Sequence, residues 1–353
     1  SSSGDSWAQR FPVKTEFPRM PLAVVCPELS KSAVEGVSKV EIRDVPARPI
    51  TANGVRVSVR SASINFPELL MMQGKYQYKP QPPFILCSEC AGVVVEVGSK
   101  VKTLKAGDRV FCAIGTNGAA CEEIVVDHRQ CVPMPDTLTF SQGAGFMMGY
   151  TTGWHALVHR GKLKAGEWLL VTGAGGGMGV AAVQLGKVLG ARVIAAASDD
   201  AKLEVCRKVG ADFVVNYSKE KLKDAVSKIT NGEFCDVIYE PVGGDVFDQC
   251  VRCVASKGYA RLLVVGFAAG RIPQLPANMA LIKGFDLIGV RMGAQFGIEP
   301  DLARETTAQL LELAQQGKLK PYVGAEYPLD RCKDAFTLIE QKKVVGKCCI
   351  TSG

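Results

Sequence analysis

The sequence predicts an α/β protein with a β-rich first part and a second part built on a doubly wound parallel sheet. Three observations carry this prediction. Residues 21–150 contain short apolar runs separated by turn dipeptides such as Asn53-Gly54. Residues 151–290 alternate regularly between strand-like and helix-like apolar patterns. A glycine cluster, residues 173–179, separates the first strand of this second part from the helix that follows it.

The β-rich part is expected to form an irregular antiparallel barrel or sheet. Its runs either alternate, as in VRVSV, or are continuously apolar, as in AGVVVEV. These two patterns are typical of half-buried and fully buried strands. Further turn signals lie at residues 98–99 and 107–108. The expected strands are Leu22–Cys26, Val55–Val59, Ala91–Val97, Arg109–Ala113 and Glu123–Val126.

The second part is expected to consist of βαβ units, with helices on both faces of a parallel sheet. The strands are expected at Trp168–Thr172, Arg192–Ala197, Phe213–Asn216, Asp236–Glu240 and Ala260–Phe267. The helices between them are expected at Met178–Leu189, Ala201–Val209, Leu222–Ile229 and Gly244–Val254. Two helices and a last strand are expected at Ala303–Gln316, Lys333–Gln341 and Lys347–Thr351. The predicted segments are 1–20, 21–150, 151–290 and 291–353.

Composition bounds the function. The 353 residues are 47% hydrophobic and 22% charged, the ordinary globular range. No apolar stretch is long enough for a transmembrane helix. The net charge of +7 is scattered along the chain, which argues against a nucleic-acid or membrane partner. Most of the 13 cysteines lie inside apolar runs, as in a reducing compartment. We expect a cytoplasmic protein, with the mitochondrion as the alternative, and residues 1–20 as a native arm, a transit-peptide remnant or an artificial extension.

The glycine cluster predicts a dinucleotide site. Ala174, Gly176 and Gly179 form an AxGxxG pattern between a strand and a helix. The first position makes the tight turn, the second admits a pyrophosphate close to the backbone, and the third lets the helix pack on the strand. The start of the helix, with Gly177 and Met178, supplies partial positive charge. The alternative is a flexible glycine-rich turn without a ligand.

The second strand of this part indicates which dinucleotide is bound. An NAD site favours a carboxylate at the strand tip for the ribose 2′-hydroxyl. Here the strand ends in alanines and Ser198, and Lys202 follows in the next helix. A hydroxyl and a cation suit a 2′-phosphate, so we predict NADPH. The alternative is that Asp199 binds the 2′-hydroxyl and Lys202 is a solvated surface residue.

Several motifs, taken together, resemble a known family. They are Gly107-Asp108-Arg109-Val110, the AxGxxG turn, Val209-Gly210-Ala211-Asp212, Asn216-Tyr217, Tyr327-Pro328-Leu329 and Gly346-Lys347. The chain resembles the medium-chain dehydrogenase/reductase superfamily over roughly residues 22–350, in its zinc-free, zeta-crystallin-like quinone oxidoreductase branch. Three further stretches are similar to quinone oxidoreductase-like proteins: Asp245–Phe247, Gly266-Phe267-Ala268 and Pro276-Ala277-Asn278.

The resemblance implies a GroES-like β-barrel catalytic domain, a Rossmann domain with a six-stranded sheet, and a C-terminal segment that returns to the catalytic domain. It also implies NADPH as the cofactor, a homodimer or homotetramer, and a small-molecule acceptor. That acceptor would be a quinone or another α,β-unsaturated carbonyl.

The resemblance also bears on zinc. The positions that hold catalytic zinc ligands in zinc-dependent members correspond to Asn65, Ser88 and a position near Met148, none of them a credible zinc ligand. The structural zinc lobe is missing as well, because residues 98–118 contain only Cys112. Without a Lewis acid, an acceptor already activated by conjugation is favoured over a simple alcohol or ketone.

The CxxC sequence formed by Cys87 and Cys90 precedes a strand, whereas a thioredoxin-like dithiol sits at a helix N-terminus. We expect buried, inert thiols, with an oxidisable pair or a metal ligand as alternatives. His155 and His159 lie four residues apart on an expected helix, the spacing of a two-histidine metal face. No acidic partner lies between them, so a packing or surface pair is favoured.

The resemblance supplies catalytic candidates. It places Asn65 beside the nicotinamide or the acceptor oxygen; the alternative is a turn residue that satisfies its own backbone. Tyr76 would lie at the substrate mouth. Thr152 would lie near the nicotinamide, although Thr151 makes the register ambiguous. Leu70 replaces a tyrosine common in quinone oxidoreductases, which makes the expected pocket more apolar.

The remaining candidates concern the cofactor. Tyr217 is expected beside the adenosine phosphate together with Lys202. Val242, Gly266 and Phe267 lie at the carboxyl ends of the fourth and fifth expected strands, where ligands bind in open α/β sheets. Arg291 and Lys347 are either cleft residues or surface charges.

Two other functions stay open. One is 2-enoyl-thioester reduction, in which the apolar run Leu69–Met72 would line an acyl channel. The other is a non-catalytic NADPH-binding protein with an RNA-binding or lens-structural role, although no aromatic and basic RNA motif is present.

Overall fold

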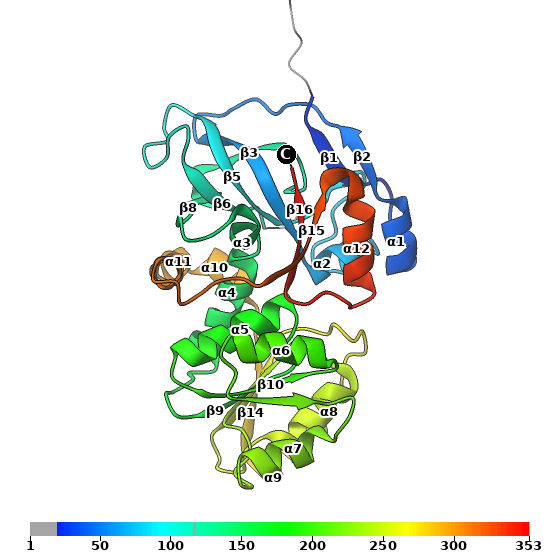
Figure 1. Ribbon diagram of the computed structural model, residues 1–353, viewed down its shortest axis with the longest axis vertical. Helices are drawn as coiled ribbons and strands as arrows, with labels where there is room; N and C mark the ends of the chain where they lie inside the picture. The colour runs from blue at the N-terminus through cyan, green and yellow to red at the C-terminus, as the bar shows by residue number, and fades with distance from the viewer. Residues whose placement is uncertain (1–19, 116–117, 353) are drawn as a thin grey trace, which may run out of the picture.

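The computed structural model describes residues 20–115 and 118–352. The prediction for residues 1–20 therefore lies outside the described residues, except for Met20. Figure 1 shows two units stacked along the long axis, with a β-rich unit above and an α/β unit below. The segment boundaries themselves stay predictions.

The β-rich unit contains a seven-stranded sheet and a three-stranded sheet. In the larger sheet, five of the six strands on the path pair antiparallel to a neighbour, and β7 pairs antiparallel with β3. Its strands are β15 (Val323–Pro328), β16 (Lys347–Thr351), β3 (Gly54–Ile64), β5 (Glu89–Val97), β6 (Arg109–Ala113), β8 (Cys131–Pro133) and β7 (Glu123–Asp127). The smaller sheet consists of β2 (Glu41–Asp44), β1 (Leu22–Cys26) and β4 (Phe84–Ile85).

The lower unit is a six-stranded parallel sheet with the order β11-β10-β9-β12-β13-β14. This is the doubly wound Rossmann order: β10 and β11 are added on one side of β9, whereas β12, β13 and β14 are added on the other. The strands are β9 (Trp168–Val171), β10 (Arg192–Ala197), β11 (Phe213–Asn216), β12 (Val237–Glu240), β13 (Ala260–Val264) and β14 (Phe285–Gly289). The fold class predicted from the sequence is therefore confirmed.

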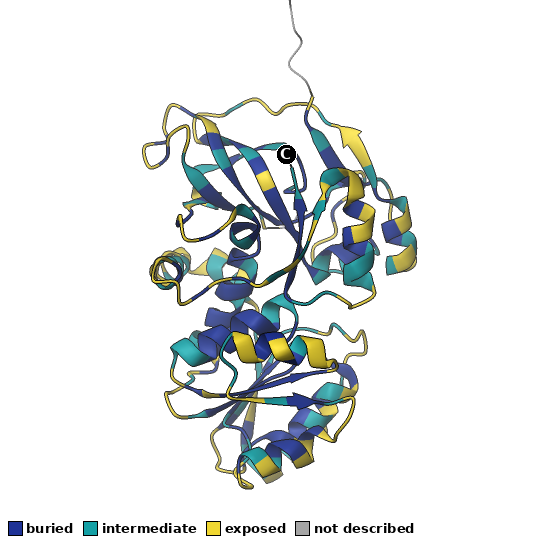
Figure 2. Ribbon diagram, in the orientation of Figure 1, coloured by how far each residue is buried: buried dark blue, intermediate teal, exposed yellow. Residues whose placement is uncertain are grey.

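Helices cover both faces of this sheet because successive strand residues point to opposite sides. Leu169 and Val171 belong to a core cluster with α5, whereas Leu170 belongs to a second cluster with α7 and α8. Figure 2 shows α5 largely buried, between the sheet and the β-rich unit. The helices around the sheet are α5 (Gly177–Val188), α6 (Asp200–Lys208), α7 (Leu222–Ile229), α8 (Gly244–Cys253) and α9 (Ala277–Lys283).

The other helices lie in or against the upper unit (Figure 1). They are α1 (Ala33–Lys39), α2 (Phe66–Met71), α3 (Phe140–Ala144), α4 (Met147–Trp154), α10 (Met292–Ile298), α11 (Pro300–Gln315) and α12 (Cys332–Glu340). A π-helical turn, His155–Arg160, extends α4. Among the described residues, no helix combines the length and hydrophobicity that crossing a bilayer requires.

Strand β16 returns from the lower unit to the middle of the upper sheet, between β15 and β3. On the way, the backbone passes the glycine turn, where the amide of Gly346 donates to the carbonyl of Gly175 at 2.7 Å. A Cβ on Gly346 would lie 2.1 Å from the Tyr322 carbonyl, and the residue has φ +69. Glycine is required there because a side chain would clash in this left-handed conformation. The two units are therefore joined at the predicted cofactor turn.

Candidate functional site

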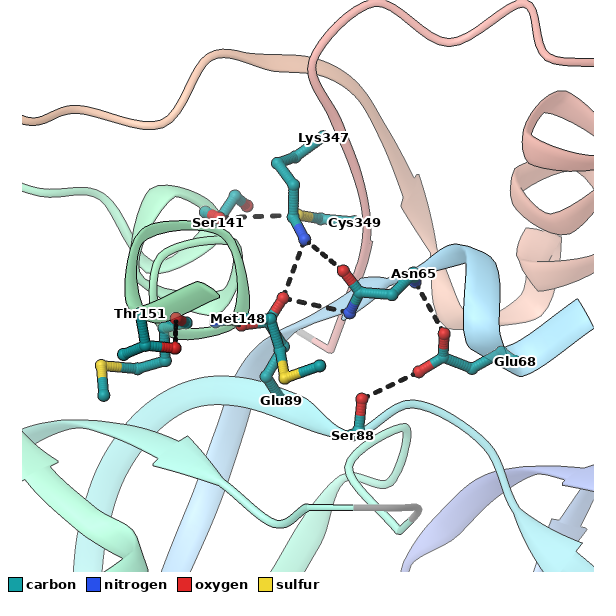
Figure 3. A network of polar contacts seen from close by, with 10 residues as sticks. Asn65, Glu68, Ser88, Glu89, Ser141, Met148, Thr151, Lys347 and Cys349 are labelled. Atoms are coloured by element: carbon teal, nitrogen blue, oxygen red, sulfur yellow. Dashed lines mark hydrogen bonds and ion pairs between the residues drawn. The ribbon is translucent and has the colours of Figure 1, made fainter. Parts of the chain in front are cut away.

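A buried polar network lies where β3, β5, α4 and β16 meet (Figure 3). Asn65 follows β3 and is the N-cap of α2. Its backbone amide donates to Glu68 Oε2 at 2.9 Å. Its side-chain amide donates to Glu89 Oε1 at 3.1 Å. Asn65 thus takes part in the cap of its own helix, as the alternative expected, and also in side-chain contacts outside that turn.

Lys347 provides the cation of this network. Its Nζ donates to Asn65 Oδ1 at 2.7 Å and to Glu89 Oε1 at 2.8 Å. The other carboxylate oxygen of Glu89 accepts from the Met148 amide at 2.9 Å. Lys347 is only 5% exposed, so its interpretation as a surface charge is wrong. The sequence did not show that Lys347 belongs to the centre of the site, because the position of a lysine at the start of an expected strand does not indicate which groups its ammonium contacts.

Glu68 is a second buried carboxyl group beside Glu89. Its Oε1 accepts a hydrogen bond from the Ser88 hydroxyl at 3.0 Å (Figure 3). Burial raises the pKa of Glu68 to about 7, while backbone amides, Ser88 and the charge of Lys347 act in the opposite direction. Ser88, at the position expected for a histidine ligand in zinc-dependent members, thus binds a carboxyl group.

The other predicted catalytic residues lie nearby with different environments. Tyr76 is partly buried, and burial with the charge of Glu68 raises its pKa. The Thr151 hydroxyl donates to the Met147 carbonyl at 2.6 Å inside α4 (Figure 3). Thr152 is more exposed and has no such bond among the described residues. This difference favours Thr152 as the threonine that faces a ligand.

The glycine turn fits a pyrophosphate. Gly176 is the N-cap of α5 and offers no side chain to the first amides of the helix. A helix start without a capping side chain leaves donors for an anion. A Cβ on Gly179 would lie 2.4 Å from the Gly173 carbonyl oxygen, so helix and turn pack too closely for a side chain. Ala174 is fully buried, and its amide donates to Ala196.

The residues predicted for the adenosine end of the cofactor, Ser198, Lys202 and Tyr217, lie near the glycine turn or contact one another. The Lys202 stem lies on the turn, since a Cβ on Gly175 would be 2.3 Å from its Cβ. Its Nζ donates to the Lys342 carbonyl at 2.6 Å. Burial raises the pKa of Tyr217, which a hydrogen bond with Ser198 opposes. Lys342 was missed because it is 140 residues away in the sequence.

Asp199 caps the helix that follows it. It is the N-cap of α6, and its carboxylate accepts from the amides of Ala201 at 2.8 Å and Lys202 at 3.3 Å. An aspartate in this position stabilises its own helix. This geometry weighs against its assignment to a ribose 2′-hydroxyl.

The carboxyl ends of β12 and β13 carry the remaining candidates. A Cβ on Gly266 would lie 3.3 Å from the Pro241 carbonyl oxygen, and Phe267 packs close to Gly243. The backbone before Gly243 is held by the buried Glu240, which accepts from the amide of Val242 at 2.8 Å and from the Thr172 hydroxyl at 3.1 Å. Glu240 was not predicted. Arg291 is exposed at the start of α10 and is not brought into the network.

The histidine and cysteine candidates do not form a metal site. His155 Nδ1 lies 3.3 Å from His159 Nδ1, a contact between the two rings. Among residues 20–115 and 118–352, no group of three or more potential ligands is placed to hold a metal ion. Cys87 and Cys90 are buried free thiols. Burial raises the pKa of Cys87 well above its usual value, as expected for an inert thiol.

The structure places most of the run 69–72, which was expected to line an acyl channel, in the hydrophobic core. Leu69 and Met71 are 2% exposed and Met72 is fully buried. All three belong to the hydrophobic core of the β-rich unit. Only Leu70 is partly exposed.

Comparison with known proteins gives consistent matches over both units. Residues 51–136 match the alcohol dehydrogenase GroES-like domain, and residues 177–316 match the zinc-binding dehydrogenase family. The chain is 41% identical over 332 residues to the quinone oxidoreductase-like protein 2 homolog of Nematostella vectensis, covering 94% of this chain and 88% of that protein.

Solved structures also match this chain over most of its length. A probable oxidoreductase from Mycobacterium abscessus is 33% identical, with a TM-score of 0.83 and coverage of 94% of this chain and 99% of that one. The Escherichia coli quinone oxidoreductase, solved in complex with NADPH, is 24% identical, with a TM-score of 0.84 and coverage of 94% and 100%.

Proposed function

The chain belongs to the quinone oxidoreductase-like proteins of the medium-chain dehydrogenase/reductase superfamily, and we propose that it reduces a quinone or another α,β-unsaturated carbonyl with NADPH, without zinc. The observation that carries the proposal is the network of Asn65, Glu89 and Lys347. Asn65 stands at a position that the resemblance assigns to a zinc ligand in zinc-dependent members, and the network lies next to the glycine turn, where the Gly346 amide donates to the Gly175 carbonyl. We also propose that the protein forms a homodimer or homotetramer in the cytoplasm or the mitochondrion.

The residues present fit the cofactor. Ala174, Gly176, Gly177, Met178 and Gly179 would hold the pyrophosphate at the start of α5. Val242, Gly266 and Phe267 would line the nicotinamide side, at the end of the sheet where open α/β folds bind ligands. When bound, NADPH supplies the hydride. Arg291, which is exposed at the start of α10, is also proposed as a cleft residue.

The protein's own task is to orient the acceptor, exclude water and stabilise the charge that develops on its oxygen. Asn65 is held from two sides, which fixes its amide without a rotation at the moment of reaction. Tyr76 and Thr152 would bound the space beside it. A conjugated acceptor needs only hydrogen-bond donors at this oxygen, whereas a simple ketone is better served by a Lewis acid.

The preference for NADPH rests on Lys202, whose Nζ donates to the backbone carbonyl of Lys342 at 2.6 Å. Burial lowers the pKa of Lys202, whereas the charge of Asp199 raises it and the charge of Lys342 lowers it. A 2′-phosphate beside this partly desolvated cation would accept a charge-assisted hydrogen bond. Asp199 offers no competing site, because it caps α6.

The decisive assay follows the loss of NADPH absorbance with 1,2-naphthoquinone, 9,10-phenanthrenequinone, a short enone and crotonyl-CoA. We expect turnover of a quinone with NADPH that a chelator does not change. Turnover of crotonyl-CoA alone would point to enoyl-thioester reduction. Tight NADPH binding without turnover of any acceptor would contradict an enzymatic role and leave the non-catalytic, RNA-binding or structural function.

Cofactor specificity is tested with Lys202→Ala. A lost charge-assisted contact to phosphate typically weakens binding by about 1.5–3 kcal/mol, or roughly 10- to 100-fold in the NADPH dissociation constant. Binding of NADH should change little. The control is Lys208→Ala on the same helix, whose ammonium lies outside this cluster at 66% side-chain exposure. Equal losses for both nucleotides would contradict the 2′-phosphate assignment.

A further inference from the structure

Lys347 forms a buried ion pair that a structural role does not explain. Its side chain is 6% exposed and that of Glu89 1%. Burying two charges costs nearly as much free energy as their attraction returns, so such pairs contribute little net stability. A buried ammonium group is therefore a candidate for chemistry.

Two hydrogen bonds fix the position of the Lys347 ammonium group. Glu89 and Asn65 accept two of its three N–H bonds, and the described part of the chain offers no third acceptor within hydrogen-bond distance. Glu89 is itself fixed by the Met148 amide. The supports come from α2, β5 and α4, so no single loop motion releases the lysine (Figure 3). One N–H is left for a ligand.

The stem of Lys347 lies over the start of the cofactor helix. A Cβ on Gly177 would be 2.4 Å from the Lys347 Cδ, and one on Gly145 would be 2.9 Å from its Cε. The side chain thus runs from the glycine turn toward Asn65. Any ligand that contacts both the turn and Asn65 passes the ammonium group.

We propose that Lys347 is a catalytic residue that donates a hydrogen bond to the acceptor oxygen and then transfers a proton to it. This inference rests on the proposed function. A carbon of the acceptor would gain hydride from NADPH, which leaves NADP⁺, and the acceptor oxygen would gain the Lys347 proton. The resulting enol would tautomerise to the hydroquinone or to the saturated carbonyl, and the neutral amine would regain a proton from solvent. Within the triad of Asn65, Glu89 and Lys347, the amide has no proton to release and the carboxylate only accepts.

The test compares Lys347→Met with the double variant Lys347→Met/Glu89→Gln, which leaves no unpaired charge in the interior. Loss of a general acid typically slows turnover by about 100- to 10,000-fold. We expect a loss of kcat in this range for both variants, with the double variant folded by circular dichroism. Lys343→Met, an exposed lysine on the same segment, should retain the wild-type kcat. Lys347→Arg should restore binding but little kcat, because arginine does not release its proton.

A second measurement does not depend on turnover. In the presence of NADP⁺, 4-nitrophenol should bind to the wild type as the phenolate, detected by its visible absorbance below the pH at which it ionises in water. Lys347→Met should bind it less tightly and as the neutral phenol. Absence of phenolate binding by the wild type would count against the lysine.

The outcomes separate the two proposals. If the wild type reduces no quinone or enone, the proposed function fails. If it does and Lys347→Met retains the wild-type kcat, the lysine is a structural or cofactor-binding group and this inference is overturned. A raised dissociation constant for NADPH with an unchanged kcat at saturation would lead to the same conclusion.

Discussion

Glu68 is a carboxyl group whose charge the fold disfavours. Its pKa rises from 4.5 to about 7 chiefly through burial. The charge of Lys347 favours the ionisation of Glu68, and a charged Glu68 opposes the ionisation of Tyr76 and Cys87. The hydrogen bond from Ser88 does not compensate fully for the lost water.

The consequence is a pH dependence with a definite sign. Between pH 4.5 and about 7 the folded state binds a proton that the unfolded state has released, so the free energy of unfolding should fall as the pH rises through this window. Glu68→Gln should remove that slope. Denaturant titrations of both proteins at several pH values measure it. Parallel stability profiles for wild type and variant would contradict a raised pKa.

Individual residues also show what the sequence could and could not predict. Asn65 was found because its motif surrounds it within a few positions. Lys347 and Lys342 act on partners 282 and 140 residues away, and no periodicity or spacing reports contacts over that distance. The role of Glu240 was not predicted, because a carboxylate at the end of a buried strand is typical of a ligand-binding or turn residue. In the structure it accepts hydrogen bonds from the backbone amides of its own loop.

Among the elements, the start of α5 depends most on the size of a side chain. A Cβ on Gly179 would lie 2.4 Å from the Gly173 oxygen and 2.5 Å from the Ala174 Cα. Both are backbone atoms, so the helix itself must shift. Gly179→Ala should therefore lower the free energy of unfolding by about 1–3 kcal/mol and weaken NADPH binding.

The matched control is Gly149→Ala in α4. There the nearest atom to a new Cβ is the Ala181 Cβ at 3.4 Å, an ordinary contact. Alanine is the better helix former by about 1 kcal/mol, so this variant should be unchanged or slightly more stable. Thermal and urea unfolding of the two variants give the comparison. Similar effects at both sites would mean that the turn tolerates a side chain.

Elements with clear periodicity were predicted within a few residues. The run Arg109–Ala113 and the last strand Lys347–Thr351 have the bounds expected from their apolar patterns. By contrast, β14, α9 and α10 were not assigned to residue ranges. Their residues are largely exposed, including Leu281 at 83% and Ile298 at 74%, so no one-sided apolar pattern marks them.

For the whole molecule, β16 is the strand on which the upper sheet depends. It pairs with β3 on one side and β15 on the other. A chain that ends after Gly346 should lose both pairings and the Lys347 network, and should unfold in its upper unit. A chain that ends after Thr351 keeps the strand and is the control. Circular dichroism melts compare them, and an unchanged melting temperature for the shorter chain would show that β16 is dispensable.

The order in which this sheet is assembled has a further consequence during translation. Asn65 and Lys347 are 282 residues apart, and the whole nucleotide-binding sheet lies between them in the sequence. When a ribosome has just produced β3, its partners β5 and β7 follow soon, but β16 is synthesised only after the whole lower unit. The part of β3 that pairs with β16 must therefore stay unpaired while the residues between Asn65 and Lys347 are synthesised, and its backbone donors and acceptors are open to other strands during that time. The network of Asn65, Glu89 and Lys347 can form only after the lower unit has been synthesised.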